Sequence, residues 1–551
     1  MPNKFKLLLI QPPIEDFYET DERLQPIGLC YLKSAVDKHL PNFSVIVKDY
    51  HQGFGRRTIP LPKELAYLKG YYSCPDKSPF SSFYHYYHFG ASFDEIAREV
   101  AEIKPDIIGI SSLFSPYYRE AIKTAEAIKQ VMDIPIIFGG SHVSAMPEMM
   151  ISHDVVDFII RGEGERPIVE FLKAWQTDGE FSHVPNMGYK NNGKILLNPI
   201  EPNYPISEIS PPDFSDLPID NYQYENTPLS FILTSRGCPY KCSFCSVHQT
   251  FGDHYRRRKV ENIFDEIVLR YEQGYRAIDF EDDNLTLNEI EFKQLCEKII
   301  EHFPNSELKL LAMNGVSYMN LDREILLLMK QAGFSNLNIS LVSSQGQTQD
   351  RINRPFSLEK YMQVVNDGFD LGFNIVSYQI LGLPSEDLNT MIDTMVLHAR
   401  LPVLIGPSMF YLTPNSPIAA DFPQMSEEDV FKSRLTAMAI ESDNFSREDL
   451  FTLFISARII NFIKGLSFEE QSCDLSSLTT KHTNDTQNMR TEIGIDLLKK
   501  LFNEKKLYAV NKNDLKPITK FKADLFYKLL GKIDYITTLN GKRIISLSDF
   551  E

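Results

Sequence analysis

The sequence predicts an α/β protein with two sheet-containing regions in series and a mostly helical C-terminal region. Short apolar runs alternate with helical segments over residues 1–170, and the same alternation returns over residues 226–425. Buried apolar runs joined by helices are typical of parallel sheets, because helical crossovers cover both faces of such sheets. Residues 171–225 read as a connector rich in turn residues, and residues 426–551 form the last region.

The first region favours a doubly wound, Rossmann-like parallel sheet. Ligands of such sheets bind at the carboxyl ends of the strands, so the residues that follow each strand are candidates for a binding site. The predicted strands are residues 6–10, 44–48, 106–110, 134–138 and 157–160.

Small or glycine-rich turns follow the last three of these strands. Glycine lets the backbone approach a ligand closely, and a small hydroxyl group hydrogen-bonds a ligand without filling the space. One such turn could serve turn geometry alone, but three together suit a large polar cofactor. The candidate residues are Ser111, Ser112, Gly139, Gly140, Ser141, His142, Gly162, Glu163 and Gly164.

The second region opens with a CxxxCxxC run, Cys238, Cys242 and Cys245, directly after an apolar segment at residues 230–234. A [4Fe–4S] cluster normally takes four thiolates, so three of them leave one iron open for chemistry. A structural zinc site would need a fourth ligand, and His248 is the local candidate. The other cysteines are scattered and are most simply small buried hydrophobic residues: Cys30, Cys74, Cys296 and Cys473.

The segments after the cysteines indicate a partial (β/α)6 barrel. Active residues of β/α barrels gather at the carboxyl ends of the strands, and the cysteines lie directly after the first predicted strand. The other five predicted strands are residues 277–280, 308–312, 337–340, 377–380 and 409–411.

Several motifs resemble the cobalamin-binding radical S-adenosylmethionine (SAM) enzymes, a family similar to class B radical SAM methyltransferases. The resemblance covers about residues 1–425 and implies a cobalamin-binding domain followed by a radical SAM barrel. Its implied cofactors are a [4Fe–4S] cluster, SAM and cobalamin. The motifs are Gln11–Pro12–Pro13, Pro26–Ile27–Gly28–Leu29–Cys30–Tyr31–Leu32, Gly139–Gly140–Ser141–His142, Arg161–Gly162–Glu163–Gly164–Glu165 and the three-cysteine run.

The resemblance also implies a set of SAM-binding positions. The carboxylates at the second strand end are expected at the methionine ammonium, although they could instead cap the following helix. The family's Gly-Ile-Glu-Ser-like run reads Ser340–Leu341–Val342–Ser343 here, so the carboxylate that binds the ribose is missing. The matching positions are Phe244, Asp282, Asp283, Asn314, Ser340, Ser343 and Gly382.

Two features near the first region leave alternatives open. Asp49–Tyr50–His51–Gln52–Gly53 departs from the Asp-x-His-x-x-Gly motif of methionine-synthase-like domains, because its glycine comes one position early. His51 is therefore either a cobalt ligand or a polar residue at a strand end or cofactor edge. The long aromatic insertion between His51 and Ser92 is either a packing flap or a lid.

The composition and charge of the chain limit which partners and which compartment we expect. The net charge of −17 argues against a nucleic-acid partner, since phosphate neutralisation needs a basic surface. No apolar stretch approaches the ~20 residues that span a bilayer, and we expect a cytoplasmic protein, a compartment that keeps thiols reduced. In the last region, residues 471–487 read as a polar linker, and Asn540–Gly541 signals a hairpin.

The resemblance implies methylation of an unactivated carbon, or phosphorus, in a small-molecule or natural-product intermediate. An external electron donor such as flavodoxin or ferredoxin would supply the reducing electrons. Radical rearrangement or cyclisation without methyl transfer is the alternative within the family, and a cobalamin- or cluster-binding regulator or redox carrier is the alternative from another class. A methylthiotransferase is disfavoured, because it needs a second cysteine triplet.

Overall fold

The computed structural model describes two compact units, each built from three segments of the chain. Unit 1 comprises Met1–Ile59, Tyr86–Asn314 and Leu412–Ser433, and unit 2 comprises Pro60–His85, Gly315–Tyr411 and Arg434–Glu551. The described residues are 4–20, 25–177, 179–201, 205–304, 307–384, 386–466, 472–474, 485–511 and 514–546.

The first sheet of unit 1 has seven strands in the order β10-β9-β8-β7-β6-β1-β3. The five predicted strands are all present and pair in parallel, which confirms the doubly wound prediction. They are β1 (Phe5–Gln11), β3 (Phe43–Asp49), β6 (Ile107–Ser111), β7 (Ile136–Gly139) and β8 (Phe158–Ile160), and the antiparallel β9 (Met187–Asn191) and β10 (Lys194–Leu197) extend one edge.

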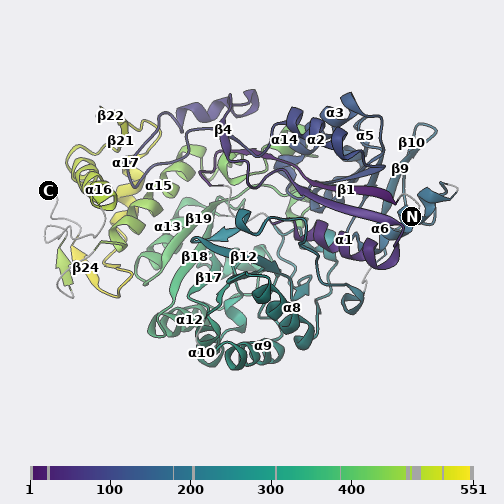
Figure 1. The fold of residues 1–551 in the computed structure, drawn as a ribbon. Helices are drawn as coiled ribbons and strands as arrows, with labels where there is room; N and C mark the ends of the chain where they lie inside the picture. The colour runs from purple at the N-terminus through teal and green to yellow at the C-terminus, as the bar shows by residue number, and fades with distance from the viewer. Residues whose placement is uncertain are drawn as a thin grey trace. The chain divides into compact units, whose positions relative to one another are not determined.

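Helices cover both faces of this sheet. Helices α1 (Ile27–His39) and α6 (Glu165–Gln176) contact each other on one face, and α2 (Phe93–Ile103) and α3 (Tyr118–Val131) contact each other on the opposite face (Figure 1). Strand β1 lies between β3 and β6, so the strand order reverses there. Ligands of doubly wound sheets bind at such a reversal, beyond the carboxyl ends of the strands.

The six predicted strands of the second region are present as two parallel sets. In unit 1, β12 (Thr227–Ile232), β15 (Ala277–Phe280) and β16 (Lys309–Leu311) pair in parallel, with β11 (Gln223–Tyr224) at the edge. In unit 2 the parallel strands are β17 (Asn336–Val342), β18 (Asn374–Leu381) and β19 (Leu404–Met409).

The last of these strands begins earlier than predicted. We expected residues 409–411, whereas β19 covers Leu404–Met409 and, among the strands that the structure describes, pairs only with β18. Gly406 and Pro407 lie inside the strand and hide its apolar pattern. Proline is tolerated there because an edge strand does not need every N–H for pairing.

Shorter elements complete unit 1. Its small sheets pair β13 (Ser235–Arg236) with β14 (Arg256–Arg257), and β2 (Ile14–Asp16) and β4 (Arg56–Thr58) with β5 (Tyr87–Phe89). Its other helices are α4 (Ser141–Ala145), α5 (Pro147–Ser152), α7 (Val247–Phe251), α8 (Val260–Glu272), α9 (Glu289–His302) and α14 (Glu427–Phe431).

Unit 2 is mostly helical outside its three parallel strands, as predicted for the C-terminal region. Its helices are α10 (Arg323–Ala332), α11 (Gly346–Arg351), α12 (Leu358–Asp370), α13 (Leu388–Ala399), α15 (Arg447–Lys464), α16 (Asp485–Glu504) and α17 (Ala523–Leu530). Its small strands are β20 (Ser472–Asp474), β21 (Tyr508–Asn511), β22 (Asp514–Pro517), β23 (Ile536–Thr537) and β24 (Arg543–Ser546). The hairpin signalled by Asn540–Gly541 is confirmed, since β23 and β24 pair antiparallel. Most of the polar linker predicted at residues 471–487 lies outside the described residues.

Residues 60–85 of the aromatic insertion pack within unit 2. Their rings contact those of α15, with centroids 5.5 Å apart for Tyr71 and Phe451 and 5.4 Å apart for Phe80 and Phe462. The Tyr72 hydroxyl donates to the Thr436 carbonyl at 2.7 Å. These contacts favour the packing interpretation of the insertion.

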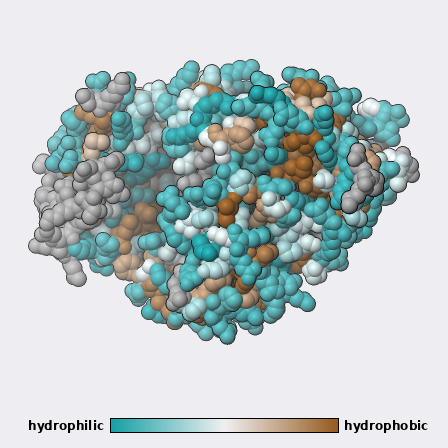
Figure 2. Space-filling view, in the orientation of Figure 1, coloured by the Kyte–Doolittle hydropathy of each residue, from teal (hydrophilic) through white to brown (hydrophobic). Residues whose placement is uncertain are grey.

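Hydrophilic residues predominate on the face drawn in Figure 2, and hydrophobic residues form small separate patches there. Among the helices that the structure describes, none has both the length and the apolar character needed to cross a membrane.

Candidate cofactor site

The three cysteines lie in a loop between β13 and α7, residues 237–245, which we call the cysteine loop. Gly237 begins it with φ +81°, and a Cβ there would lie 2.5 Å from the His254 carbonyl oxygen, so only glycine permits this turn. Within the loop, the Cys245 N–H donates to the Cys242 carbonyl at 3.0 Å. The thiols of Cys238, Cys242 and Cys245 are free of disulfides.

The surroundings of the thiols fit a positively charged group. Burial raises the pKa of the Cys245 thiol to about 11, and a bound metal ion deprotonates a thiol that coordinates it. The Asn284 Nδ2 lies 3.9 Å from the Cys238 Sγ and can donate to it. Phe244 is half-buried in the same loop.

His248, the candidate fourth ligand of a zinc site, is engaged through one ring nitrogen. His248 Nε2 lies 2.9 Å from the Cys238 carbonyl oxygen, which only accepts, so this nitrogen carries the proton and donates. In the described part of the chain, no group of three or more His, Cys, Asp or Glu side chains is arranged to hold a metal ion. The assignment of the cysteines to a [4Fe–4S] cluster stays a prediction.

Asp282 has a structural position at the end of β15. Its buried carboxylate accepts from the Thr234 N–H at 3.1 Å and hydroxyl at 2.7 Å, and from the Ser235 hydroxyl. These bonds join β15 to the chain that leads into the cysteine loop. Both oxygens of Asp282 are therefore occupied, although the sequence also predicted this residue at the methionine ammonium.

Asp283 is the more accessible carboxylate of the predicted pair. It accepts from the Gly237 N–H at 3.0 Å, and its side chain is exposed. Partial desolvation of the carboxylate, together with the charge of Asp282, raises its pKa to about 6. Neither aspartate caps α9, because the Asn288 side chain accepts from the Glu291 N–H and serves as that cap.

Glu281 is a candidate that we did not single out from the sequence. The Asn314 Nδ2, predicted near the ribose, donates to the Glu281 Oε2 at 2.7 Å. Burial, and then the neighbouring Asp279, raise the pKa of Glu281 to about 8. The sequence contains the pattern that could have identified Glu281. Alternate residues of a strand share a face, and this spacing places Asp279, Glu281 and Asp283 on one side.

The remaining SAM-binding positions lie in unit 2. Ser343 is fully buried, and the Ser340 carbonyl accepts from Arg354 at 3.0 Å. Between them, Val342 has φ +67° beside a register shift, a strained conformation for a β-branched residue. Gly382 has φ +88°, and a Cβ there would lie 3.0 Å from the Leu450 side chain.

The turn after β7, Gly139–Gly140–Ser141–His142, packs on Ser112 after β6. The Ser112 N–H donates to the Gly139 carbonyl at 2.7 Å, and the His142 N–H donates to the Ser112 carbonyl at 3.1 Å. A Cβ at Gly140, where φ is +111°, would lie 2.6 Å from the Ser112 carbonyl oxygen. Ser111 is the last residue of β6.

This turn has buried polar atoms that suit a ligand. Within the described residues, neither Ser112 Oγ nor His142 Nε2 has a hydrogen-bond partner, although both are buried. His142 Nδ1 lies 3.0 Å from the Ser115 hydroxyl, and burial lowers the pKa of His142 to about 3, which keeps the ring neutral. Buried polar atoms normally have partners, so these two fit a polar cofactor such as cobalamin.

The turn after β8 is engaged by the protein instead. The Glu163 carboxylate binds Arg236 at 2.7 Å and Arg256 at 2.8 Å. A Cβ at Gly162 would lie 3.3 Å from the Thr250 carbonyl oxygen of α7, and one at Gly164 would lie 3.0 Å from the Leu32 side chain. The cobalamin contacts predicted for Gly162, Glu163 and Gly164 remain untested predictions.

His51 lies in a buried turn after β3. The Asp49 carboxylate accepts from the His51 N–H at 2.8 Å and from the Tyr222 hydroxyl at 2.6 Å. The His51 ring is fully buried, with its centroid 6.2 Å from that of Phe89. Asp49 therefore stabilises the turn.

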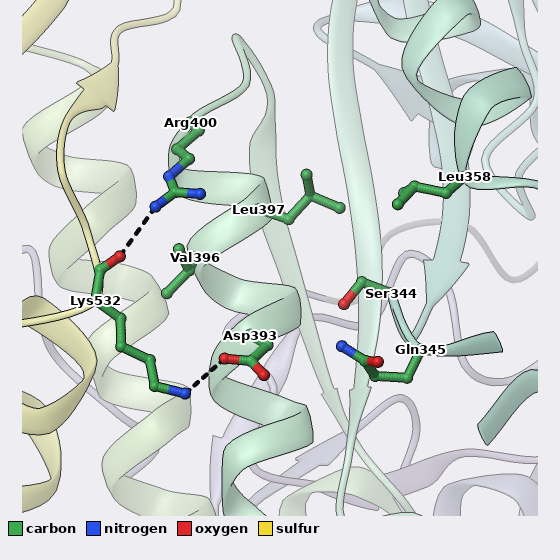
Figure 3. Close-up of a pocket in the computed structure, with 8 residues that line it drawn as sticks. All are labelled: Ser344, Gln345, Leu358, Asp393, Val396, Leu397, Arg400 and Lys532. Atoms are coloured by element: carbon green, nitrogen blue, oxygen red, sulfur yellow. Dashed lines mark hydrogen bonds and ion pairs between the residues drawn. The ribbon is translucent and has the colours of Figure 1, made fainter. Parts of the chain in front are cut away.

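Unit 2 also has a hollow of about 630 Å³ beside α13. Its charged groups pair with one another, as Figure 3 shows: Lys532 Nζ lies 2.7 Å from Asp393, and Arg400 Nη2 lies 3.1 Å from the Lys532 carbonyl oxygen. Ser344 and Gln345 line the other side (Figure 3). Because its cations are paired, we assign this hollow no ligand.

Two family models match the chain, the B12 binding domain over residues 83–172 and the Radical SAM superfamily over residues 232–397. The chain is therefore a radical SAM enzyme. It belongs to the cobalamin-binding radical SAM enzymes, with a [4Fe–4S] cluster, SAM and cobalamin as cofactors.

Relatives support this family. An uncharacterized methyltransferase of Pyrococcus horikoshii is 28% identical over 316 residues, which cover 57% of this chain and 68% of the relative. A cytidylyl-2-hydroxyethylphosphonate methyltransferase of Streptomyces wedmorensis is 23% identical over 69% of this chain and 73% of its own length. An anaerobic magnesium-protoporphyrin IX monomethyl ester cyclase of Rubrivivax gelatinosus is 27% identical over 55% of this chain and 56% of its own length.

The fold matches a solved structure of the radical SAM methyltransferase TsrM from Kitasatospora setae. The TM-score is 0.58 at 17% identity, with 76% of this chain and 74% of that chain covered.

Proposed function

We propose that this chain is a cobalamin-dependent radical SAM methyltransferase acting on an unactivated carbon, or phosphorus, of a small-molecule or natural-product intermediate. The observation that carries the proposal lies within unit 1, where α7, which follows the cysteine loop, contacts the turns of the cobalamin-binding sheet. The Thr250 hydroxyl of α7 lies 3.2 Å from the Ser141 hydroxyl. Chemistry that uses both cofactors needs their sites close together, and two of the relatives described above are methyltransferases.

In this proposal the chain's residues have separate roles. Cys238, Cys242 and Cys245 hold the cluster, and Asp283 accepts from the methionine ammonium of SAM. Ser112 and His142 hydrogen-bond cobalamin with their buried, unpartnered atoms. When bound, the cluster with SAM supplies a radical that removes a hydrogen atom, and cobalamin supplies the methyl group.

The other predicted contacts belong to the same proposal. Phe244, Asn314, Ser340, Ser343 and Gly382 would contact SAM, with Glu281 orienting Asn314 through their 2.7 Å hydrogen bond. An external electron donor, flavodoxin or ferredoxin, would reduce the cluster.

The decisive experiment is anaerobic incubation with SAM, a reductant and cobalamin. We expect 5′-deoxyadenosine from the unaltered chain and only background from Cys242→Ala. Because the substrate is unidentified, the assay uses an anaerobic metabolite extract and SAM with a deuterated methyl group. A product that carries the deuterated methyl supports the proposal, and a complete absence of 5′-deoxyadenosine would sink it.

Cyclisation or rearrangement without methyl transfer is the second candidate, and the similarity to the magnesium-protoporphyrin cyclases favours it. The same labelling experiment separates the two. A cyclase would form 5′-deoxyadenosine and a product that has lost hydrogen or been rearranged, with no deuterated methyl group.

A further inference from the structure

A buried cluster of four charged side chains joins the start of the cysteine loop to the cobalamin-binding sheet. Arg236 binds Glu163 at 2.7 Å and Glu165 at 2.5 Å, and Arg256 binds the other oxygen of Glu163 at 2.8 Å. The Arg236, Glu163 and Glu165 side chains are only 6%, 10% and 7% exposed. We call these four residues the charged junction.

The charged junction lies close to the cysteines along the chain, so it can fix where the cysteine loop begins. Arg236 lies in β13, two residues before Cys238, and pairs with Arg256 across the small sheet. The two glutamates lie in the turn after β8 and in the first turn of α6. A guanidinium group that binds two carboxylates fixes orientation as well as distance.

The other end of the cysteine loop contacts the same sheet, at the turns that follow β7 and β8. Helix α7 begins two residues after Cys245, and its Thr250 lies against Ser141 and Gly162, as described above. The guanidinium of Arg236 also lies 5.7 Å from the centroid of the Phe251 ring.

The middle of the loop is held by the returning segment, Leu412–Ser433. The Ile418 N–H donates to the Ser243 carbonyl at 2.8 Å, and Gln249 of α7 donates to the Pro414 carbonyl at 3.1 Å. The Asn415 side chain donates to the Ala145 carbonyl of α4. The cysteine loop is thus attached to the cobalamin-binding sheet at its start, middle and end.

We propose that Arg236 is a positioning residue that sets the separation between the cluster and the cobalt of cobalamin. The ion pairs themselves are weak evidence for stability, because desolvation offsets much of their attraction, and they are better suited to fixing one arrangement. The proposal rests on the assignment of the three cysteines to the cluster. It does not depend on methyl transfer.

The test measures the separation directly. The chain is prepared with its cluster and cob(II)alamin, the cluster is reduced, and the dipolar coupling between the two paramagnetic centres is recorded by pulsed electron paramagnetic resonance. We expect one narrow distance distribution for the unaltered chain and a broadened or shifted one for Arg236→Met, with iron and cobalamin contents unchanged. Arg236→Lys should restore the distribution only in part, because a single ammonium cannot bind both carboxylates as a fork does.

A matched control lies one residue beyond the charged junction. Arg166 and Glu201 form an exposed pair at 2.9 Å, with side chains 52% and 47% exposed, so Arg166→Met should leave the distribution unchanged. An unchanged distribution in Arg236→Met would overturn the proposal, as would loss of iron with cobalamin retained, since the residue would then build the cluster site.

If Arg236→Met does not fold, Glu163→Gln provides the same test with little change in volume. It keeps one acceptor for the arginines and removes the charge, and an unchanged distribution in that variant would overturn the proposal. No turnover is required, so failure of the methyltransferase proposal would leave this measurement interpretable.

Discussion

The turn after β7 and the turn after β8 follow the carboxyl ends of two neighbouring strands and have similar glycine-rich sequences. Their surroundings nevertheless differ. Around Gly140, buried polar atoms of Ser112 and His142 have no hydrogen-bond partner in the described structure. Around Glu163, the carboxylate is bound by two arginines from the second region. Gly140 in the first turn lets the backbone pack closely on Ser112, next to the unpartnered atoms, whereas Gly162 in the second turn lets the backbone approach α7.

The largest expected effect is on the free energy of unfolding, when the Glu163 side chain is removed from the turn after β8. Glu163→Ala leaves Arg236 without one of its carboxylates and removes the ion pair of Arg256, and breaking a buried ion pair costs about 3–5 kcal/mol. We expect a fall of that order in the free energy of unfolding, measured by denaturant titration under anaerobic conditions. Cobalamin affinity, measured by absorbance titration, should stay nearly unchanged, and a loss comparable to that of a first-turn variant would contradict the comparison.

A substitution in the turn after β7 should instead affect cobalamin binding more than stability. In Gly140→Ala the new methyl group meets the Ser112 carbonyl in a conformation with φ +111°, and such backbone strain costs roughly 1–3 kcal/mol. We expect cobalamin retention on gel filtration to fall severalfold. Gly28→Ala is the control, because a Cβ there meets nothing within 4 Å, and equal losses in the two variants would refute the assignment.

Substitutions of two serines, one at each turn, should separate the effect on cobalamin affinity from the effect on stability. Ser112→Ala removes a hydroxyl without a partner in the described structure, so stability should hold while cobalamin affinity falls by roughly 3–10-fold, the value of one hydrogen bond. Ser144→Ala removes the acceptor of the Gly162 N–H, 2.7 Å away, and should lower stability without changing affinity. Parallel titrations and melting curves would show whether the two effects separate.

The smallest effect is in the pH dependence of stability. Burial lowers the pKa of His142 from 6.5 to about 3, so the unfolded chain binds more protons between these values and stability falls as pH falls through that window. His142→Asn should remove a slope of at most about 1.4 kcal/mol per pH unit. Burial opposes ionisation of Glu165, but the charge of Arg236 lowers its pKa overall from 4.5, so Glu165→Gln should flatten the curve only below about pH 4.5. Unfolding free energies measured from about pH 3 to about pH 7 test both windows.

The sequence predicted the elements of the fold better than the contacts of the site. Apolar runs locate the strands because burial imposes their pattern, and β19 was misplaced only where Gly406 and Pro407 interrupt it. The two glycine-rich turns could not be told apart, because Arg236 meets Glu163 from 73 residues away. The position of Asp282 was equally hidden, since its partners Thr234 and Ser235 lie 48 and 47 residues earlier in the chain.

The returning segment, Leu412–Ser433, has a consequence for synthesis of the chain. Its contacts with the cysteine loop form only after residues 315–411, which belong to unit 2, have left the ribosome. Unit 1 therefore depends on contacts of long sequence separation, which form slowly. A nascent chain that pauses before residue 412 would present its cysteines with Ser243 still lacking its bond to Ile418.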